Sequence, residues 1–306
     1  MKHTLPVTLL LVLVFFVAQL VGLGLIAAGT SVSLDENGNR VVAHEDTAIG
    51  ARPDTHGFGS FIYLTIGIAI GTVVILVLVK YRLARVWKLW FFLAVWLAIT
   101  VAAGAIVNKW VAFFVGLGLA YWKIFKPNVL IHNITEILVY SGIALLIAPI
   151  FDVLWASMLL IAIAIYDAYA VWHSKHMVSM AKFQTETQLF AGLLIPYERK
   201  AVTIAPKAQL AVKPVQKPQE NKSAILGGGD IAFPMLFAGA VLSWLIQSGL
   251  TKFAAYVESL IVVICAMLAL LLLFLYAKQD EFYPAMPFLA AGCFVGYGIV
   301  YLLHIL

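Results

Sequence analysis

Two aspartates stand inside apolar segments of this sequence, where an ionisable side chain is costly. Asp167 lies within the run Ile-Ala-Ile-Ala-Ile-Tyr-Asp-Ala-Tyr-Ala-Val-Trp, and Asp230 follows three glycines at the start of another apolar run. A charged group in hydrocarbon normally faces a partner or a water-filled cavity, because its desolvation is unfavourable. The two aspartates are therefore the first candidates for a functional site.

The two carboxylates are expected to lie at similar depth. At 1.5 Å per residue, Asp167 stands about 9 Å before the end of its apolar run, and Asp230 about 6 Å after the start of the next. Consecutive segments usually neighbour one another. Two like charges at close range share a proton, so that one group can act as a general base on water while the other polarises a carbonyl. The aspartic-protease dyad shows this pattern, although a carboxylate in a membrane is also typical of an ion- or proton-coupled carrier.

The elements that must position these aspartates are membrane helices. Of the 306 residues, 63% are hydrophobic and 11% are charged, whereas globular domains are about half apolar and a quarter charged. A transmembrane helix needs about twenty apolar residues, and nine segments approach this length. We therefore predict an all-α polytopic membrane protein with nine transmembrane helices. The predicted spans are 5–28, 60–79, 89–107, 110–125, 129–150, 153–173, 226–247, 257–276 and 285–305.

Three details refine this prediction. Segment 110–125 is short and aromatic. Segment 5–28 precedes small residues, as a signal peptide does, but its apolar run exceeds the about 7–15 residues of a signal peptide, so we predict a retained helix. The pairs Gly67/Gly71 and Gly292/Gly296 have the spacing of closely packed helices.

The basic residues predict the orientation. With a cytoplasmic N-terminus, 16 of the 20 lysine and arginine residues fall on the cytoplasmic side, as the positive-inside rule requires. The C-terminus then lies outside. Because the basic residues cluster in short loops beside the spans, we expect no nucleic-acid partner. Cys265 and Cys293 lie in apolar runs and indicate neither a disulfide framework nor a metal site.

One long linker divides the chain. Residues 174–224 are rich in proline, lysine and glutamine and predict a largely flexible cytoplasmic loop without a core of its own. The expected organisation is a six-helix block, 1–173, with Asp167, followed by this loop and a three-helix block, 225–306, with Asp230.

Three short motifs stand out in these blocks. They are Tyr166-Asp167, Gly227-Gly228-Gly229-Asp230 and Pro284-Ala285-Met286. These motifs resemble the YD, GxGD and Pro-Ala-Leu motifs of presenilin and signal peptide peptidase, which are intramembrane aspartyl proteases. The order of the motifs, the number of spans and the orientation also agree with this family.

The resemblance implies roles for these residues. Asp167 and Asp230 would be the catalytic pair, with Tyr166 in support. The substrate would lie against the other motif residues, which are Gly227, Gly228, Gly229, Pro284, Ala285 and Met286. The implied activity is hydrolysis of transmembrane proteins or remnant signal peptides near the cytoplasmic face of the cell membrane, without metal or cofactor. The compact loops are typical of a prokaryotic homologue.

The chain departs from the family pattern at two positions. Met286 replaces a leucine of similar volume, so we expect its role to be kept. Gly228 occupies the variable position of GxGD, which would loosen the backbone. Outside the motifs, Glu136 lies about 10 Å inside its predicted span, one helical turn after His132. Either these two form a local pair, or Glu136 is a third proton-handling group.

Two other functions are compatible with intramembrane carboxylates. An ion- or proton-coupled transporter would use Asp167, Asp230 and Glu136 as ligands, but no inverted repeat is visible. A non-catalytic membrane chaperone or receptor would not need both aspartates. Natural substrates, the preferred lipid and the oligomeric state cannot be inferred from the sequence.

Overall fold

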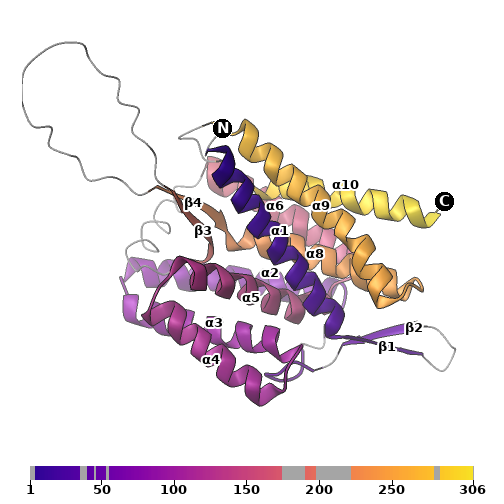
Figure 1. Ribbon diagram of the computed structural model, residues 1–306, viewed down its shortest axis with the longest axis horizontal. Coiled ribbons are helices and arrows are strands. Elements are labelled where there is room, and N and C mark those ends of the chain that lie inside the picture. The colour runs from indigo at the N-terminus through magenta and orange to yellow at the C-terminus, as the bar shows by residue number, and fades with distance from the viewer. Residues whose placement is uncertain are drawn as a thin grey trace, which may run out of the picture.

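The computed structural model describes residues 4–34, 40–44, 46–52, 55–173, 190–197, 222–278 and 283–305. Helices dominate this part of the chain (Figure 1). They are α1 (Leu5–Ala28), α2 (Phe58–Lys80), α3 (Ala84–Gly104), α4 (Lys109–Phe125), α5 (Val129–Ile147), the 3₁₀ turn η1 (Ala148–Ile150), α6 (Val153–Trp172), α8 (Gly228–Gln247), α9 (Lys252–Tyr276) and α10 (Met286–Ile305). Two antiparallel hairpins are formed by β1 (Thr30–Leu34) with β2 (Arg40–His44) and by β3 (Gly192–Tyr197) with β4 (Lys222–Gly227).

The all-α polytopic architecture is confirmed. Among the described residues, 8 helices are long and apolar enough to cross a membrane. The remaining predicted span is α4, with 17 residues, so the number of nine spans stays a prediction. Helices α3 and α9 begin at Ala84 and Lys252, before the predicted positions 89 and 257, because apolarity marks the hydrocarbon core and a helix can continue beyond it.

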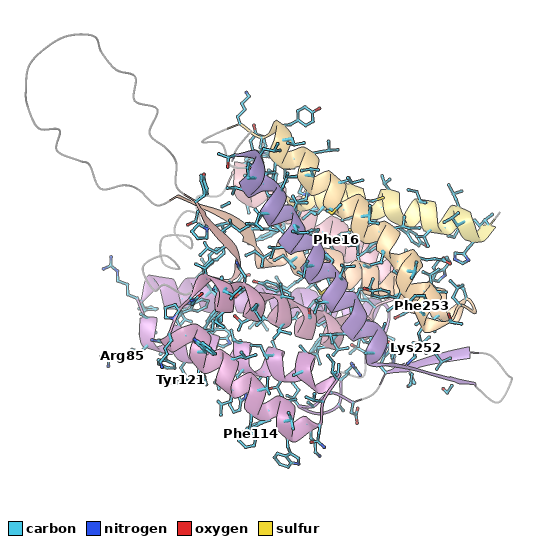
Figure 2. All side chains as sticks on the ribbon, viewed as in Figure 1. Phe16, Arg85, Phe114, Tyr121, Lys252 and Phe253 are labelled. Atoms are coloured by element: carbon cyan, nitrogen blue, oxygen red, sulfur yellow. The ribbon has the colours of Figure 1, made fainter. Side chains whose placement is uncertain are left out.

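Large apolar side chains cover the outside of the bundle. Figure 2 shows Phe114 and Tyr121 projecting from α4, and Phe253 projecting from α9. Phe253 is 77% exposed in the isolated chain. An apolar surface of this extent is expected where lipid replaces water.

Helix α8, which carries Asp230, lies at the centre of the bundle. It contacts α1, α5, α6, α9 and α10. Its residues 234–246 are almost all buried, and the Phe237 ring packs edge-on against Phe294 of α10 with centroids 5.6 Å apart. The position of α8 is therefore determined by neighbours on all sides, including α1, whose Phe15 is fully buried.

The two glycine pairs behave differently. A Cβ on Gly292 would come within 2.8 Å of the Ala266 Cα, and one on Gly296 within 2.5 Å of the Val262 Cα, so close packing of α10 on α9 is confirmed. In contrast, a Cβ on Gly67 or Gly71 of α2 would meet no atom of another element within 4 Å among the described residues, so the packing prediction is wrong for that pair in this structure. Small residues permit close approach, but a partner helix must also be present.

The β3–β4 hairpin adds ordered structure at the ends of the predicted linker. Leu193 and Ile195 of β3 and Leu226 of β4 are buried in the main core. The alternation of buried residues along β3 is that of a strand with one face on a core. The ends of segment 174–224 therefore contribute to the core, and the proposed boundary at 224/225 falls within β4. The rest of the linker lies outside the described residues.

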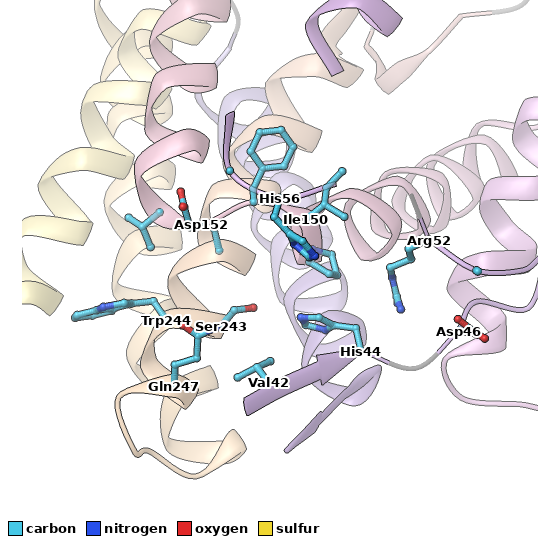
Figure 3. Close-up of a pocket in the computed structure, with 16 residues that line it drawn as sticks. Val42, His44, Asp46, Arg52, His56, Ile150, Asp152, Ser243, Trp244 and Gln247 are labelled. Carbon is cyan, nitrogen blue, oxygen red and sulfur yellow. The ribbon is translucent and has the colours of Figure 1, made fainter. Parts of the chain in front are cut away.

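The β1–β2 hairpin lies at the opposite end of α1 from β3–β4 (Figure 1). Beside it is a pocket of about 550 Å³, between β2, η1 and the end of α8. Figure 3 shows His44, Arg52, His56 and Trp244 around this pocket. Neither Asp167 nor Asp230 lines it, so the pocket is distinct from the site that the sequence predicts.

His44 should make the stability of this end pH-dependent. Burial, and secondarily the Arg52 guanidinium, lower the pKa of His44 from 6.5 to about 4. Between pH 6.5 and 4 the unfolded chain therefore binds more protons at this histidine than the folded chain, and stability falls as the pH decreases through this window.

We expect His44→Gln to reduce the decrease in Tm between pH 7 and 4.5, as measured by thermal unfolding in detergent. The exposed neighbour His56, changed to Gln, should leave that decrease unchanged. If Tm decreased equally with pH in the wild type and in His44→Gln, His44 would not be the cause of the pH dependence.

Candidate active site

Asp167 is held by the start of α10. It lies in α6, five residues before the helix ends at Trp172. Its Oδ2 accepts a hydrogen bond from the Met286 backbone N–H at 3.1 Å, and the Ala285 N–H donates to the same carboxylate. The third sequence motif therefore contacts the first aspartate through its backbone.

Asp230 is held by the strand that precedes it. It is the third residue of α8, and its carboxylate accepts from the N–H of Gly227, the residue at the helix N-cap. This bond is one half of a capping box, in which an N3 side chain reaches back to the N-cap backbone. Since Gly227 also ends β4, the hairpin leads directly into the aspartate.

The following residues of α8 disturb the regular helix. Pro234 lacks the N–H that would bond to the Asp230 carbonyl four residues earlier. Next to it, the fully buried Gln19 of α1 donates from Nε2 to the Ile231 carbonyl at 2.8 Å. Side-chain contacts from another helix thus help to hold the first turns of α8.

The structure brings the two aspartates together. Helices α6 and α8 are in contact, and the carboxylates of Asp167 and Asp230 are close enough to interact electrostatically. Both lie at the end of the bundle that carries the β3–β4 hairpin. Two neighbouring acidic groups can act as a general acid and a general base on one reacting carbonyl.

Other predicted site residues differ in their surroundings. Pro284 is buried, and Met286 is 3% exposed, so the Met286 side chain packs in the core while its N–H faces Asp167. Tyr166 is 56% exposed and, within the described residues, has no hydrogen bond to either aspartate. The support of the aspartates by Tyr166 therefore stays a prediction.

Met286 stands where the family motif has leucine, and its burial predicts how substitutions at this position affect activity. Met286→Leu should keep cleavage activity within about threefold, because exchanges that conserve volume in a core cost less than about 1.5 kcal/mol. Met286→Ala should lower Tm and activity, since truncating a buried methionine costs about 2–5 kcal/mol. Thermal unfolding and cleavage rates would test both, with Phe288→Ala as an exposed control two residues away. Equal effects of the alanine variants at 286 and 288 would contradict the prediction.

The three glycines before Asp230 are not equivalent. A Cβ on Gly228 would overlap the Tyr140 hydroxyl and come within 2.6 Å of its ring carbons Cε1 and Cζ. A Cβ on Gly229 would only touch the Phe233 ring at 3.5 Å. Neither glycine has a positive φ. Gly228 is therefore required by the close approach of Tyr140, and the expectation that it loosens the backbone is not supported by this geometry.

Glu136 lies in a buried polar network that the sequence analysis missed. It forms an ion pair with Lys123 of α4 and accepts hydrogen bonds from Tyr140 and from the Gly192 N–H. His132 contacts the Gly192 carbonyl at 2.8 Å and lies within electrostatic range of Glu136, but the hydrogen bonds of Glu136 in the described part of the chain come from Lys123, Tyr140 and Gly192. Lys123 is one of the 16 basic residues that the predicted orientation places on the cytoplasmic side. The network could have been suspected from the position of Lys123 within the predicted span 110–125, because a charge inside a membrane span needs a partner.

An apolar groove of about 380 Å³ runs between α6 and α10 beside Asp167. Its wall includes Ala168 and Pro287, which directly follow Asp167 and Met286 in the chain. The rest of its wall is apolar. It comprises Ile161, Ala164, Ile165, Trp172, Ala290, Ala291 and Phe294.

Comparisons with known proteins agree with these observations. The model of the family described as signal-peptide peptidase, presenilin aspartyl protease matches residues 41–305. Two crystal forms, P2 and C222, of a presenilin family intramembrane aspartate protease have a similar fold, with TM-scores of 0.58 and 0.59 at 15% identity. These alignments cover 99% and 97% of this chain, respectively, and 99% of the solved chain in both cases. No curated protein matches.

Proposed function

Because the chain belongs to the signal-peptide peptidase and presenilin aspartyl protease family, we propose that Asp167 and Asp230 are its catalytic pair. The protein is a multi-pass intramembrane aspartyl endopeptidase, and the family acts on membrane proteins. The alternative of an ion- or proton-coupled transporter finds no support in these matches. The observation that carries the residue assignment is the junction of all three motifs, in which the Met286 N–H donates to Asp167 within electrostatic range of Asp230.

The reaction follows from two carboxyl groups that share one proton. The ionised aspartate removes a proton from water as the water oxygen adds to the peptide carbonyl, and the protonated aspartate donates to the carbonyl oxygen. The tetrahedral intermediate then collapses with proton transfer to the leaving nitrogen. Water is the nucleophile, so no acyl-enzyme forms. Backbone N–H groups of Ala285 and Met286 keep Asp167 oriented during these steps.

The free edge of β4 provides a place for an extended substrate. A transmembrane substrate must unwind locally, because its peptide carbonyls are otherwise held in helical hydrogen bonds. The outer edge of β3 is already occupied, since Asn133 bonds both the N–H and the carbonyl of Leu194, at 2.9 and 2.8 Å. No strand in the described part of the chain pairs with the other edge of β4. A substrate strand added there would recover backbone hydrogen bonds directly before Asp230.

The substrate class follows from these two surfaces. The α6–α10 groove suits the apolar side chains of a transmembrane segment, and the β4 edge suits its unwound part. Single-span membrane proteins and remnant signal peptides have both features. With the N-terminus in the cytoplasm, as the basic residues predict, cleavage takes place near the cytoplasmic face of the cell membrane.

A direct cleavage assay tests this function. The protein, purified in mild detergent, is incubated with a single-span substrate, and the fragments are identified by mass spectrometry. We expect new termini within the hydrophobic segment, nearer its cytoplasmic end. An intact substrate from a folded enzyme, over a series of substrates and pH values, would refute the proposal.

A further inference from the structure

A buried ion pair joins α4 to α5, and α5 packs against α8, the helix that carries Asp230. Glu136 of α5 is 1% exposed and pairs through Oε1 with Lys123 of α4, which is 5% exposed. Its Oε2 accepts from the Tyr140 hydroxyl and, at 2.8 Å, from the Gly192 N–H of β3. We refer to Lys123, Glu136 and Tyr140 as the Glu136 network.

Stability alone does not account for this network. Two charges removed from water lose their hydration, and apolar side chains of similar size often replace a buried ion pair without loss of stability. Here the carboxylate receives three donors on its two oxygens, and the Lys123 ammonium also lies 5.6 Å from the Phe91 ring centroid. Such complete pairing restricts the geometry of every group involved, which points to a positional requirement.

Both branches of the network end at the residues before Asp230. In one branch, Glu136 binds Gly192, which is the strand partner of Gly227, and the Gly227 N–H donates to Asp230. In the other branch, Glu136 orients Tyr140, whose ring lies against the Cα of Gly228. Tyr140 is also close enough to Asp230 to interact with it electrostatically.

We propose that the Glu136 network positions Asp230. Glu136 and Tyr140 are positioning residues that hold β3 and the first turn of α8 in register, and Lys123 provides the charge that keeps Glu136 in place. The inference rests on the proposed function, in which Asp230 takes part in proton transfer. It assigns a role to a charged pair on α4 and α5 that lies outside all three sequence motifs.

Kinetics should separate positioning from folding. Tyr140→Phe keeps the ring against Gly228 but loses the bond to Glu136, and Glu136→Gln keeps the size but removes the charge. Because a displacement of about 1 Å can cost about 100-fold in rate, we expect kcat to fall about 10- to 100-fold. KM should change less than kcat, because the α6–α10 groove is unaffected and only the β4 edge of the substrate surface is loosened. Lys123→Met should lower kcat to a similar extent. Lys123→Arg keeps the positive charge and should retain most of the wild-type kcat.

Hydrogen–deuterium exchange measures the same effect without activity. In Tyr140→Phe and Glu136→Gln, peptides covering residues 222–235 should exchange faster than in the wild type, because the hairpin and the first turn of α8 lose an anchor. Glu258→Gln is the matched control. It makes the same chemical change in another interhelical pair, between Glu258 of α9 and His304 of α10 at 2.6 Å, and should alter neither kcat nor exchange at 222–235.

The outcomes are distinct. Unchanged kcat per folded enzyme together with unchanged exchange at 222–235 would overturn the proposal, even if yield or Tm decreased. Faster exchange with reduced kcat would support it. If the wild type cleaved no substrate, the proposed function would fail, and the exchange measurement alone would decide whether the network holds the first turn of α8.

Discussion

Asp167→Asn and Asp230→Asn should each abolish intramembrane cleavage. Asparagine keeps the size of the side chain and can still accept the backbone hydrogen bonds, but it cannot exchange a proton with water or with the scissile carbonyl. General acid–base catalysis contributes about 10²- to 10⁴-fold per group, so the loss should reach at least about 10³-fold and leave no detectable fragments. The measurement is mass spectrometry of substrate fragments at equal concentrations of folded enzyme.

Asp152→Asn is the matched control for both variants. Asp152 belongs to α6, as Asp167 does, but it is the N-cap at the opposite end, where its Oδ1 accepts from the Trp155 N–H at 2.8 Å. Asparagine is also a good N-cap residue, so activity and Tm should remain close to the wild type. Cleavage at the wild-type rate by either active-site variant would reject the proposed pair, because a dyad cannot work with one member.

Gly228→Ala should reduce cleavage about 100-fold, although it adds only one methyl group. That methyl would meet the Tyr140 ring carbons at 2.6 Å, which is shorter than any real contact, so either the ring or the first turn of α8 must move. A shift of about 1 Å at Asp230 is enough for a loss of this size. Gly229→Ala should remain active, because its methyl would make an ordinary contact with Phe233 at 3.5 Å. The prediction is tested by measuring the cleavage rates of Gly228→Ala and Gly229→Ala at equal concentrations of folded enzyme, with Tm measured for both.

A double variant identifies the cause of the loss at Gly228. Tyr140→Leu removes the bond to Glu136 and is itself expected to lower the rate, but it also creates space beside Gly228, so the loss in the double variant should be smaller than the sum of the two single losses. Residues in contact show such non-additive effects, whereas independent sites do not. Additive losses, or equal activity of the alanine variants at 228 and 229, would show that Tyr140 does not restrict this turn.

Most of the architecture and both candidate aspartates could be predicted from the amino-acid sequence. The long apolar runs predict the helices because burial in lipid requires each segment to satisfy its own backbone hydrogen bonds. Asp167 and Asp230 were identified because a carboxylate in such a run is unfavourable without a function, and because the short motifs around them match a family pattern. Both signals are local, so they can be read without knowledge of neighbouring helices.

The contacts between side chains of distant segments could not be predicted in this way. Met286 was assigned to the substrate surface, but its side chain is buried and its N–H donates to Asp167, a residue 119 positions earlier. Glu136 was placed with His132, one turn away, but its buried carboxylate pairs with Lys123 of another helix. In a low-dielectric interior a charge takes the donors that the packing brings to it, and that packing depends on contacts between distant segments. No local pattern in the sequence contains this information.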